Sequence, residues 1–117
     1  MLQKSNKQAT IVMFWKTNCS GSKMQLSEVN KLYKKYGDQG LEVIYLSPDT
    51  KMRIQNFRKT HNVSGLIGQV NKATLVKPYQ LLATPSVYLI DKKGIVQDVW
   101  LVPKKLEALE EKVKPYL

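Results

Sequence analysis

Two apolar segments separated by one helical segment constrain the fold of this chain more than any other feature. Residues 8–15 (QATIVMFW) and 41–46 (LEVIYL) are continuous apolar runs rich in β-branched and aromatic residues, which is typical of buried strands. Between them, four apolar residues recur at helical spacing before Gly37, a plausible helix stop: Val29, Leu32, Tyr33 and Tyr36. A helix that connects two neighbouring strands requires parallel pairing with a right-handed crossover, so this half of the chain predicts a β-α-β unit.

A second helix is expected after Asp49, which is a suitable N-cap residue. One side of this helix carries three residues at helical spacing: Ile54, Phe57 and His61. Glycine and proline interrupt residues 62–83, so no more than a short strand or one turn of helix is expected there.

The last third of the chain predicts a hairpin and a final helix. Residues 86–90 and 95–101 flank a polar loop that ends in Gly94, which is typical of a β-hairpin. Pro103 occupies a natural first position for a helix that buries Leu106, Leu109 and Val113 and pairs Glu110 with Lys114. The expected architecture is therefore a single α/β domain over residues 1–117, with the order β-α-β-α-β-β-α, a mixed central sheet and helices on both faces.

Composition limits the classes of partner. The chain has 19 Lys and Arg residues against 9 Asp and Glu residues, a net charge of +10. These cations are scattered along the chain, and no nucleic-acid-binding motif accompanies them. The pattern therefore favours a solvated basic surface over nucleic-acid binding. An acidic partner and an anionic membrane surface are the alternatives. No apolar run approaches the ~20 residues of a membrane span, so no membrane insertion by this segment is expected. A cytoplasmic protein and a mature domain without its targeting segment both remain open.

Cys19 is the only cysteine, so the chain can form neither an internal disulfide nor a cysteine-based structural zinc site. No phosphate-binding or dinucleotide loop is present, and no cofactor or metal is expected. Cys19 stands where the first strand ends and the first helix begins, and the positive end of a helix dipole favours a thiolate. On position alone, a reactive nucleophile and an inert cysteine at a helix end are equally compatible with the sequence.

Three segments resemble thioredoxin-like proteins, in the same order and over nearly the whole chain. Residues 14–22 (FWKTNCSGS) are similar to the active-site segment of bacterial TlpA/ResA-type thiol–disulfide oxidoreductases, in which Phe-Trp precedes Cys-x-x-Cys by two or three residues. Residues 83–94 (ATPSVYLIDKKG) resemble the cis-proline strand of that family, and residues 36–44 (YGDQGLEVI) resemble its helix-to-strand connection. The resemblance implies a thioredoxin fold and thiol–disulfide exchange.

The same resemblance implies roles for individual residues. Cys19 matches the attacking cysteine, and Pro85 matches the cis-proline beside it. The backbone of Thr84 would pair with a substrate chain, and Trp15 and Asn18 are the other candidate substrate-binding residues. The implied partners are a disulfide-containing protein or small thiol substrate and a reducing thiol, and the implied location is extracytoplasmic, either periplasmic or membrane-tethered.

The chain departs from the family pattern at three positions. Ser22 replaces the second, resolving cysteine; its hydroxyl can bond the Cys19 thiolate, which makes it a candidate catalytic residue, but it cannot form an internal disulfide. Met13 replaces a buried aspartate, and Asn18 replaces a tryptophan. An engineered serine, a natural monothiol variant and a loss of catalysis all account for Ser22.

Two other functions stay in view. A non-catalytic thioredoxin-fold module could hold a peptide between the Cys19 turn and Pro85. A peroxiredoxin-like peroxidase is less favoured, because Thr17 lies two residues before Cys19 and the Thr-x-x-Cys spacing of those enzymes is missing. His61, the only histidine, is expected to be a partly exposed or capping residue and not a catalytic one.

Overall fold

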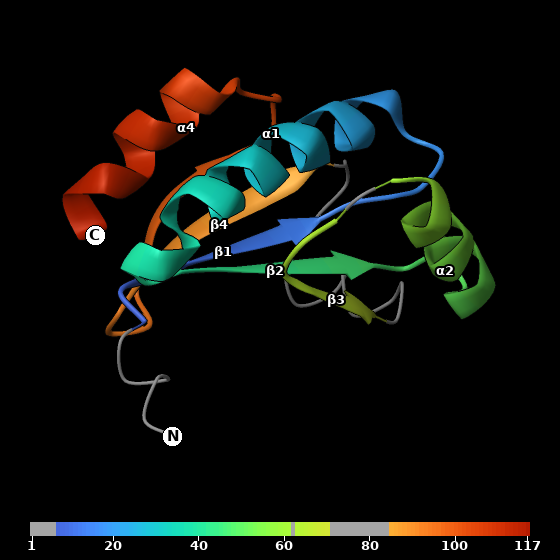
Figure 1. The fold of residues 1–117 in the computed structure, drawn as a ribbon, viewed down its shortest axis with the longest axis horizontal. Coiled ribbons are helices and arrows are strands. Elements are labelled where there is room, and N and C mark those ends of the chain that lie inside the picture. The colour runs from blue at the N-terminus through green and yellow to red at the C-terminus, as the bar shows by residue number, and fades with distance from the viewer. Residues whose placement is uncertain (1–6, 62, 71–84) are drawn as a thin grey trace.

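A computed structural model describes residues 7–61, 63–70 and 85–117 of the chain. Its elements follow one another in this order: β1 (Ala9–Phe14), α1 (Ser20–Tyr36), the 3-10 helix η2 (Gly37–Gln39), β2 (Leu41–Ser47), α2 (Lys51–Thr60), β3 (Leu66–Gln69), β4 (Ser86–Asp91), β5 (Val96–Trp100), α4 (Leu106–Val113) and the 3-10 helix η3 (Lys114–Tyr116) (Figure 1).

The strands form one mixed sheet with the order β3-β2-β1-β4-β5. β1 pairs in parallel with β2, and β2 pairs in parallel with β3, while β4 runs antiparallel to both β1 and β5. The predicted β-α-β unit and the late hairpin are therefore confirmed. β3 is the short strand that residues 62–83 were expected to allow.

One face of the sheet carries the main core. α1 and α4 both lie over this face (Figure 1). The strands turn alternate residues toward the helices, because successive side chains of a strand point to opposite faces. The β1 and β2 residues that belong to the buried cluster on this face are Ala9, Ile11, Met13, Leu41, Val43 and Tyr45. They meet Leu26, Val29 and Leu32 of α1 and Leu109 and Val113 of α4 in one cluster.

The predicted end of the first helix is confirmed, and the predicted start of the second helix is wrong. α1 ends at Tyr36 with Gly37 as its C-cap at φ −56°, and η2 follows before Gly40 takes the positive φ of 101°. Thr50 and not Asp49 caps α2, because the Thr50 side chain accepts a hydrogen bond from the Arg53 N–H at 3.2 Å. The Asp49 carboxylate is instead used by the turn before α1.

The start of α4 and its predicted ion pair are also corrected. Pro103 is not the first helical residue, since α4 begins at Leu106. Glu110 turns away from Lys114 toward α1, where it pairs with Lys35 at 2.5 Å and accepts from the Tyr36 hydroxyl at 2.7 Å. Because α4 packs on α1, Glu110 interacts with two partners at once. An exposed ion pair with Lys114 within one helix would stabilise the fold less.

His61 occupies the capping position that the sequence predicted. Its backbone N–H donates to the Phe57 carbonyl at 2.9 Å at the end of α2, and its exposed ring stacks on the Phe57 ring with centroids 3.9 Å apart. The histidine therefore ends a helix.

Candidate thiol site

Cys19 is the N-cap residue of α1. Its backbone is extended, with φ −111° and ψ 119°, and its carbonyl accepts the first helical hydrogen bond, from the Lys23 N–H at 3.0 Å. The first turn contains no acidic residue, and the Cys19 side chain does not cap the helix. The partly exposed Cys19 thus lies at the positive end of a 17-residue helix that no carboxylate of that turn neutralises.

The turn before Cys19 is held by Asp49 from outside it and by a backbone hydrogen bond within it. The Thr17 N–H donates to the Asp49 carboxylate at 2.6 Å, and the Cys19 N–H donates to the Lys16 carbonyl at 3.3 Å. Asp49 follows β2 and Cys19 follows β1, so the parallel pairing of the two strands brings both residues to the same end of the sheet. The side chain of Asn18, between these anchors, is exposed. The sequence pattern missed the role of Asp49 because its partner lies in another segment.

Ser22 lies in the first turn of α1 and is fully buried. Its hydroxyl oxygen accepts a hydrogen bond from the Lys16 N–H at 3.2 Å, which ties the helix to the preceding turn. The hydroxyl proton is still available for donation. Ser22 therefore has a structural role, and its predicted catalytic role stays a prediction.

Gly21 is the point at which three distant segments meet. A Cβ at this position would lie 3.4 Å from Cδ of Pro85, 3.7 Å from Cγ of Pro103 and 4.0 Å from the Cys19 sulfur. Pro85 thus lies against the first turn of α1, two residues after Cys19, and its predicted place beside the thiol stays a prediction. Thr84 and its peptide bond to Pro85 lie outside the described residues. The sequence analysis did not place Pro103 at the site.

Gln25 holds the loop that carries Pro103. Its fully buried side chain accepts from the Trp100 indole N–H at 3.0 Å and from the Lys104 N–H at 2.9 Å, and donates to the Lys104 carbonyl at 3.0 Å. One turn later, Glu28 accepts from the Leu106 N–H at 2.9 Å. Two side chains of α1 thereby fix the backbone between β5 and α4.

The prediction that Trp15 contacts a substrate is wrong for this structure. The Trp15 side chain is 0% exposed, and its ring packs on Phe57 with centroids 4.9 Å apart. The residue directly follows β1 and lies on the face covered by helices, as its alternation with Met13 requires. Trp15 therefore supports the turn from beneath.

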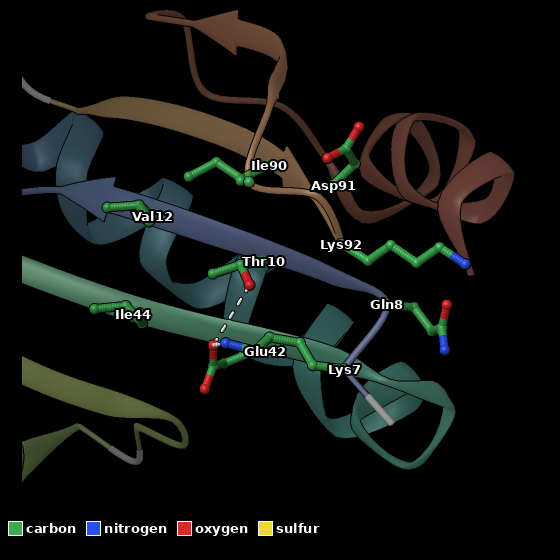
Figure 2. Close-up of a pocket in the computed structure, with 10 residues that line it drawn as sticks. Lys7, Gln8, Thr10, Val12, Glu42, Ile44, Ile90, Asp91 and Lys92 are labelled. Carbon is green, nitrogen blue, oxygen red and sulfur yellow. Dashed lines mark hydrogen bonds and ion pairs between the residues drawn. The ribbon is translucent and has the colours of Figure 1, made fainter. Parts of the chain in front are cut away.

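A surface pocket of about 590 Å³ lies at the other end of β1 (Figure 2). Thr10 and Glu42 point toward each other across it, and Lys7 pairs with Glu42 at 2.8 Å. The pocket shares no residue with the turn around Cys19. Over residues 7–61, 63–70 and 85–117 there is no group of three or more potential metal ligands, and no helix there is long and apolar enough to cross a bilayer.

Sequence comparison relates the chain to thiol–disulfide oxidoreductases. A family model described as the AhpC/TSA family matches residues 1–99. Over 106 residues, the chain is 30% identical to the thiol-disulfide oxidoreductase ResA of Bacillus thuringiensis subsp. konkukian, and the match covers 89% of this chain and 58% of that protein. The chain thus spans little more than half the length of this relative.

Structure comparison shows the fold. The crystal structure of StoA from Bacillus subtilis matches with a TM-score of 0.79 and 23% identity, over 93% of this chain and 85% of that one. A thiol:disulfide interchange protein of the thioredoxin family from Chlorobium tepidum matches with a TM-score of 0.84 and 18% identity, over 95% and 81% of the two chains. The predicted thioredoxin fold is confirmed.

Proposed function

Because the chain belongs to the AhpC/TSA family, we propose that it is a thioredoxin-like thiol–disulfide oxidoreductase domain whose nucleophile is Cys19. One observation carries this proposal: Cys19 is partly exposed at the N-cap of α1, and Gly21, two residues later in the first turn, lies against Pro85. A helix N-terminus stabilises a thiolate, which is the reactive form of cysteine. The relatives named as oxidoreductases support the assignment.

The proposed reaction begins with attack of the Cys19 thiolate on one sulfur of a substrate disulfide. A bond forms between the two sulfurs, the substrate disulfide breaks, and the departing sulfur leaves with the electron pair and takes a proton from water. The product is a mixed disulfide. Ser22 has no sulfur with which to displace the substrate, so an external thiol must attack the Cys19 sulfur or its partner to complete a turnover.

The surrounding residues receive roles in the same proposal. Asn18 is exposed beside Cys19 and Pro85 lies against Gly21, so both would contact the substrate, with the backbone of Thr84 adding a strand-like pairing. The substrate class is a disulfide-containing protein, and the second partner is a reducing thiol. The resemblance to TlpA/ResA-type proteins supports an extracytoplasmic location in a bacterium.

The activated thiol is tested by alkylation. The rate of reaction with iodoacetamide, measured against pH, is expected to give an apparent pKa for Cys19 at least about one unit below the ~8.5 of an unperturbed thiol. Cys19→Ser is the control variant, and any reaction with iodoacetamide that it shows is modification of other residues. A thiol that reacts only after denaturation would rule out the proposed nucleophile.

The missing resolving thiol is tested by Ser22→Cys. With a model disulfide, the chain with Ser22 is expected to accumulate a mixed disulfide that mass spectrometry detects. Ser22→Cys is expected to form an internal disulfide and to turn over with dithiothreitol as the reductant. If Ser22→Cys forms no internal disulfide and adds nothing to the rate with dithiothreitol alone, the non-catalytic peptide-binding module takes the place of the oxidoreductase.

A further inference from the structure

A groove separate from the thiol site runs between α2 and β3. Its volume is about 200 Å³, and we call it the α2–β3 groove. Its sides are formed by Lys51, Gln55 and Arg58 of α2 and by Ile67, Gly68 and Gln69 of β3. None of the described residues that line the groove carries a carboxylate.

The helix that borders this groove is strongly basic. α2 contains four cations and no acidic residue, and all four cations are exposed: Lys51, Arg53, Arg58 and Lys59. None of the four forms an ion pair with another residue in the described part of the chain. Lys51 and Arg58 are seven positions apart, about two helical turns, and both border the groove. The unneutralised charge favours an acidic ligand.

The strand on the other side of the groove is an edge strand. β3 pairs only with β2 in the described sheet. The Val70 N–H donates to the Ser47 carbonyl at 2.8 Å, so by alternation the backbone groups of Gly68 face β2, while those of Ile67 and Gln69 face outward. No backbone hydrogen bond from this outer edge is recorded over the described residues. Such an edge can pair with an added strand.

The groove ends close to the thiol site. β3 runs parallel to β2 and β1, so the carboxyl ends of all three strands lie at the same end of the sheet, where Cys19 follows β1. The Gln69 side chain donates to the Asp49 carbonyl at 2.8 Å, and the Asp49 carboxylate holds the Thr17 N–H. A segment lying along β3 would therefore point toward the turn before Cys19.

We propose that the α2–β3 groove binds an extended acidic segment of a partner protein, which adds as a strand to the outer edge of β3 and places its carboxylates against Lys51 and Arg58. These two residues are about 10 Å apart along the helix at 1.5 Å per residue. A strand advances ~3.3 Å per residue and presents alternate side chains to one face, so acidic residues two and four positions apart, ~7 Å and ~13 Å, bracket this separation.

The test uses a fluorescein-labelled peptide of about eight residues that alternates glutamate with threonine. Fluorescence anisotropy is expected to show saturable binding that weakens as salt rises to about 0.3 M. Lys51→Gln combined with Arg58→Gln is expected to raise the Kd at least about fivefold. The matched control combines Lys34→Gln with Lys92→Gln, which removes the same charge from exposed positions outside the groove and is expected to change the Kd less than about twofold.

Two probes separate strand addition from general charge attraction. The same peptide with N-methylated backbone amides keeps its charge but cannot donate to β3, and its binding is expected to be lost. Equal binding of the methylated peptide, or an equal effect of both variant pairs, would overturn the proposal. So would binding to vesicles with anionic lipid when the peptide does not bind. Cys19→Ser is expected to bind the peptide unchanged, so this result does not depend on the thiol chemistry.

Discussion

Gln25→Leu tests whether the buried amide holds the loop between β5 and α4. Leucine fills a similar volume but offers no hydrogen bond. The substitution removes all three bonds of the Gln25 side chain, which join it to the Trp100 indole and to both backbone groups of Lys104. Trp100 is 6% exposed, so its N–H is left without a partner in the core.

The expected cost follows from these three lost bonds. A buried donor left without a partner costs about 1–3 kcal/mol, and the partly buried groups of Lys104 cost less because water can reach them. Removing the polar amide from the core returns about 1–2 kcal/mol. Gln25→Leu is therefore expected to lower the free energy of unfolding by about 3 kcal/mol. Without these hydrogen bonds, the loop between β5 and α4 should also move Pro103 away from Gly21.

Urea denaturation followed by circular dichroism at the helical band measures this free energy. The matched control is Gln55→Leu, the same change at an exposed site on a helix, which is expected to stay within about 0.5 kcal/mol of the natural chain. In a Trp100→Phe background, Gln25→Leu should cost about 1 kcal/mol less, because the indole N–H is no longer there to lose its acceptor. A loss below about 1 kcal/mol for Gln25→Leu in the natural background would refute the reasoning.

Three further predictions concern stability, each measured by urea denaturation. Gly65→Ala should destabilise the fold more than Gly94→Ala by at least about 1 kcal/mol. Both glycines have positive φ, but only Gly65 has a backbone oxygen 3.0 Å from the position of the added Cβ. Equal losses of unfolding free energy would contradict this packing. Asp49→Ala should cost about 1–2 kcal/mol and Asp49→Asn less, since the asparagine oxygen can still accept from the turn, and equal costs would exclude that hydrogen bond. The Lys35 ammonium beside Glu110 lowers the pKa of that carboxyl. The pair therefore stabilises the fold above the pKa that Glu110 has in the unfolded chain, and this stabilisation is lost as the pH falls through the pKa of the folded state. Glu110→Gln should reduce the dependence of the free energy of unfolding on acidic pH, and an unchanged slope would contradict the pairing.

The order of strands and helices could be predicted because its signals are local. An apolar run, a helical spacing and a glycine at a hairpin turn each depend on a few consecutive residues. The errors share one cause. Asp49, Pro103 and Glu110 were each assigned to the nearest helix, but each is held by a residue far away in the chain. A capping or pairing residue satisfies whichever partner the fold brings close, and sequence proximity does not decide that partner.

By itself, the sequence determined that one cysteine follows a buried strand and begins a helix, and that no second cysteine can resolve a mixed disulfide. These properties depend only on the order and kind of residues. Only the tertiary structure decided that Pro103 lies against Gly21, that Trp15 has no exposed surface, and that Gln25 holds the loop before α4. Each of these depends on segments that are distant in sequence and meet only through the strand order of the sheet and the packing of α1, and no local pattern encodes such contacts.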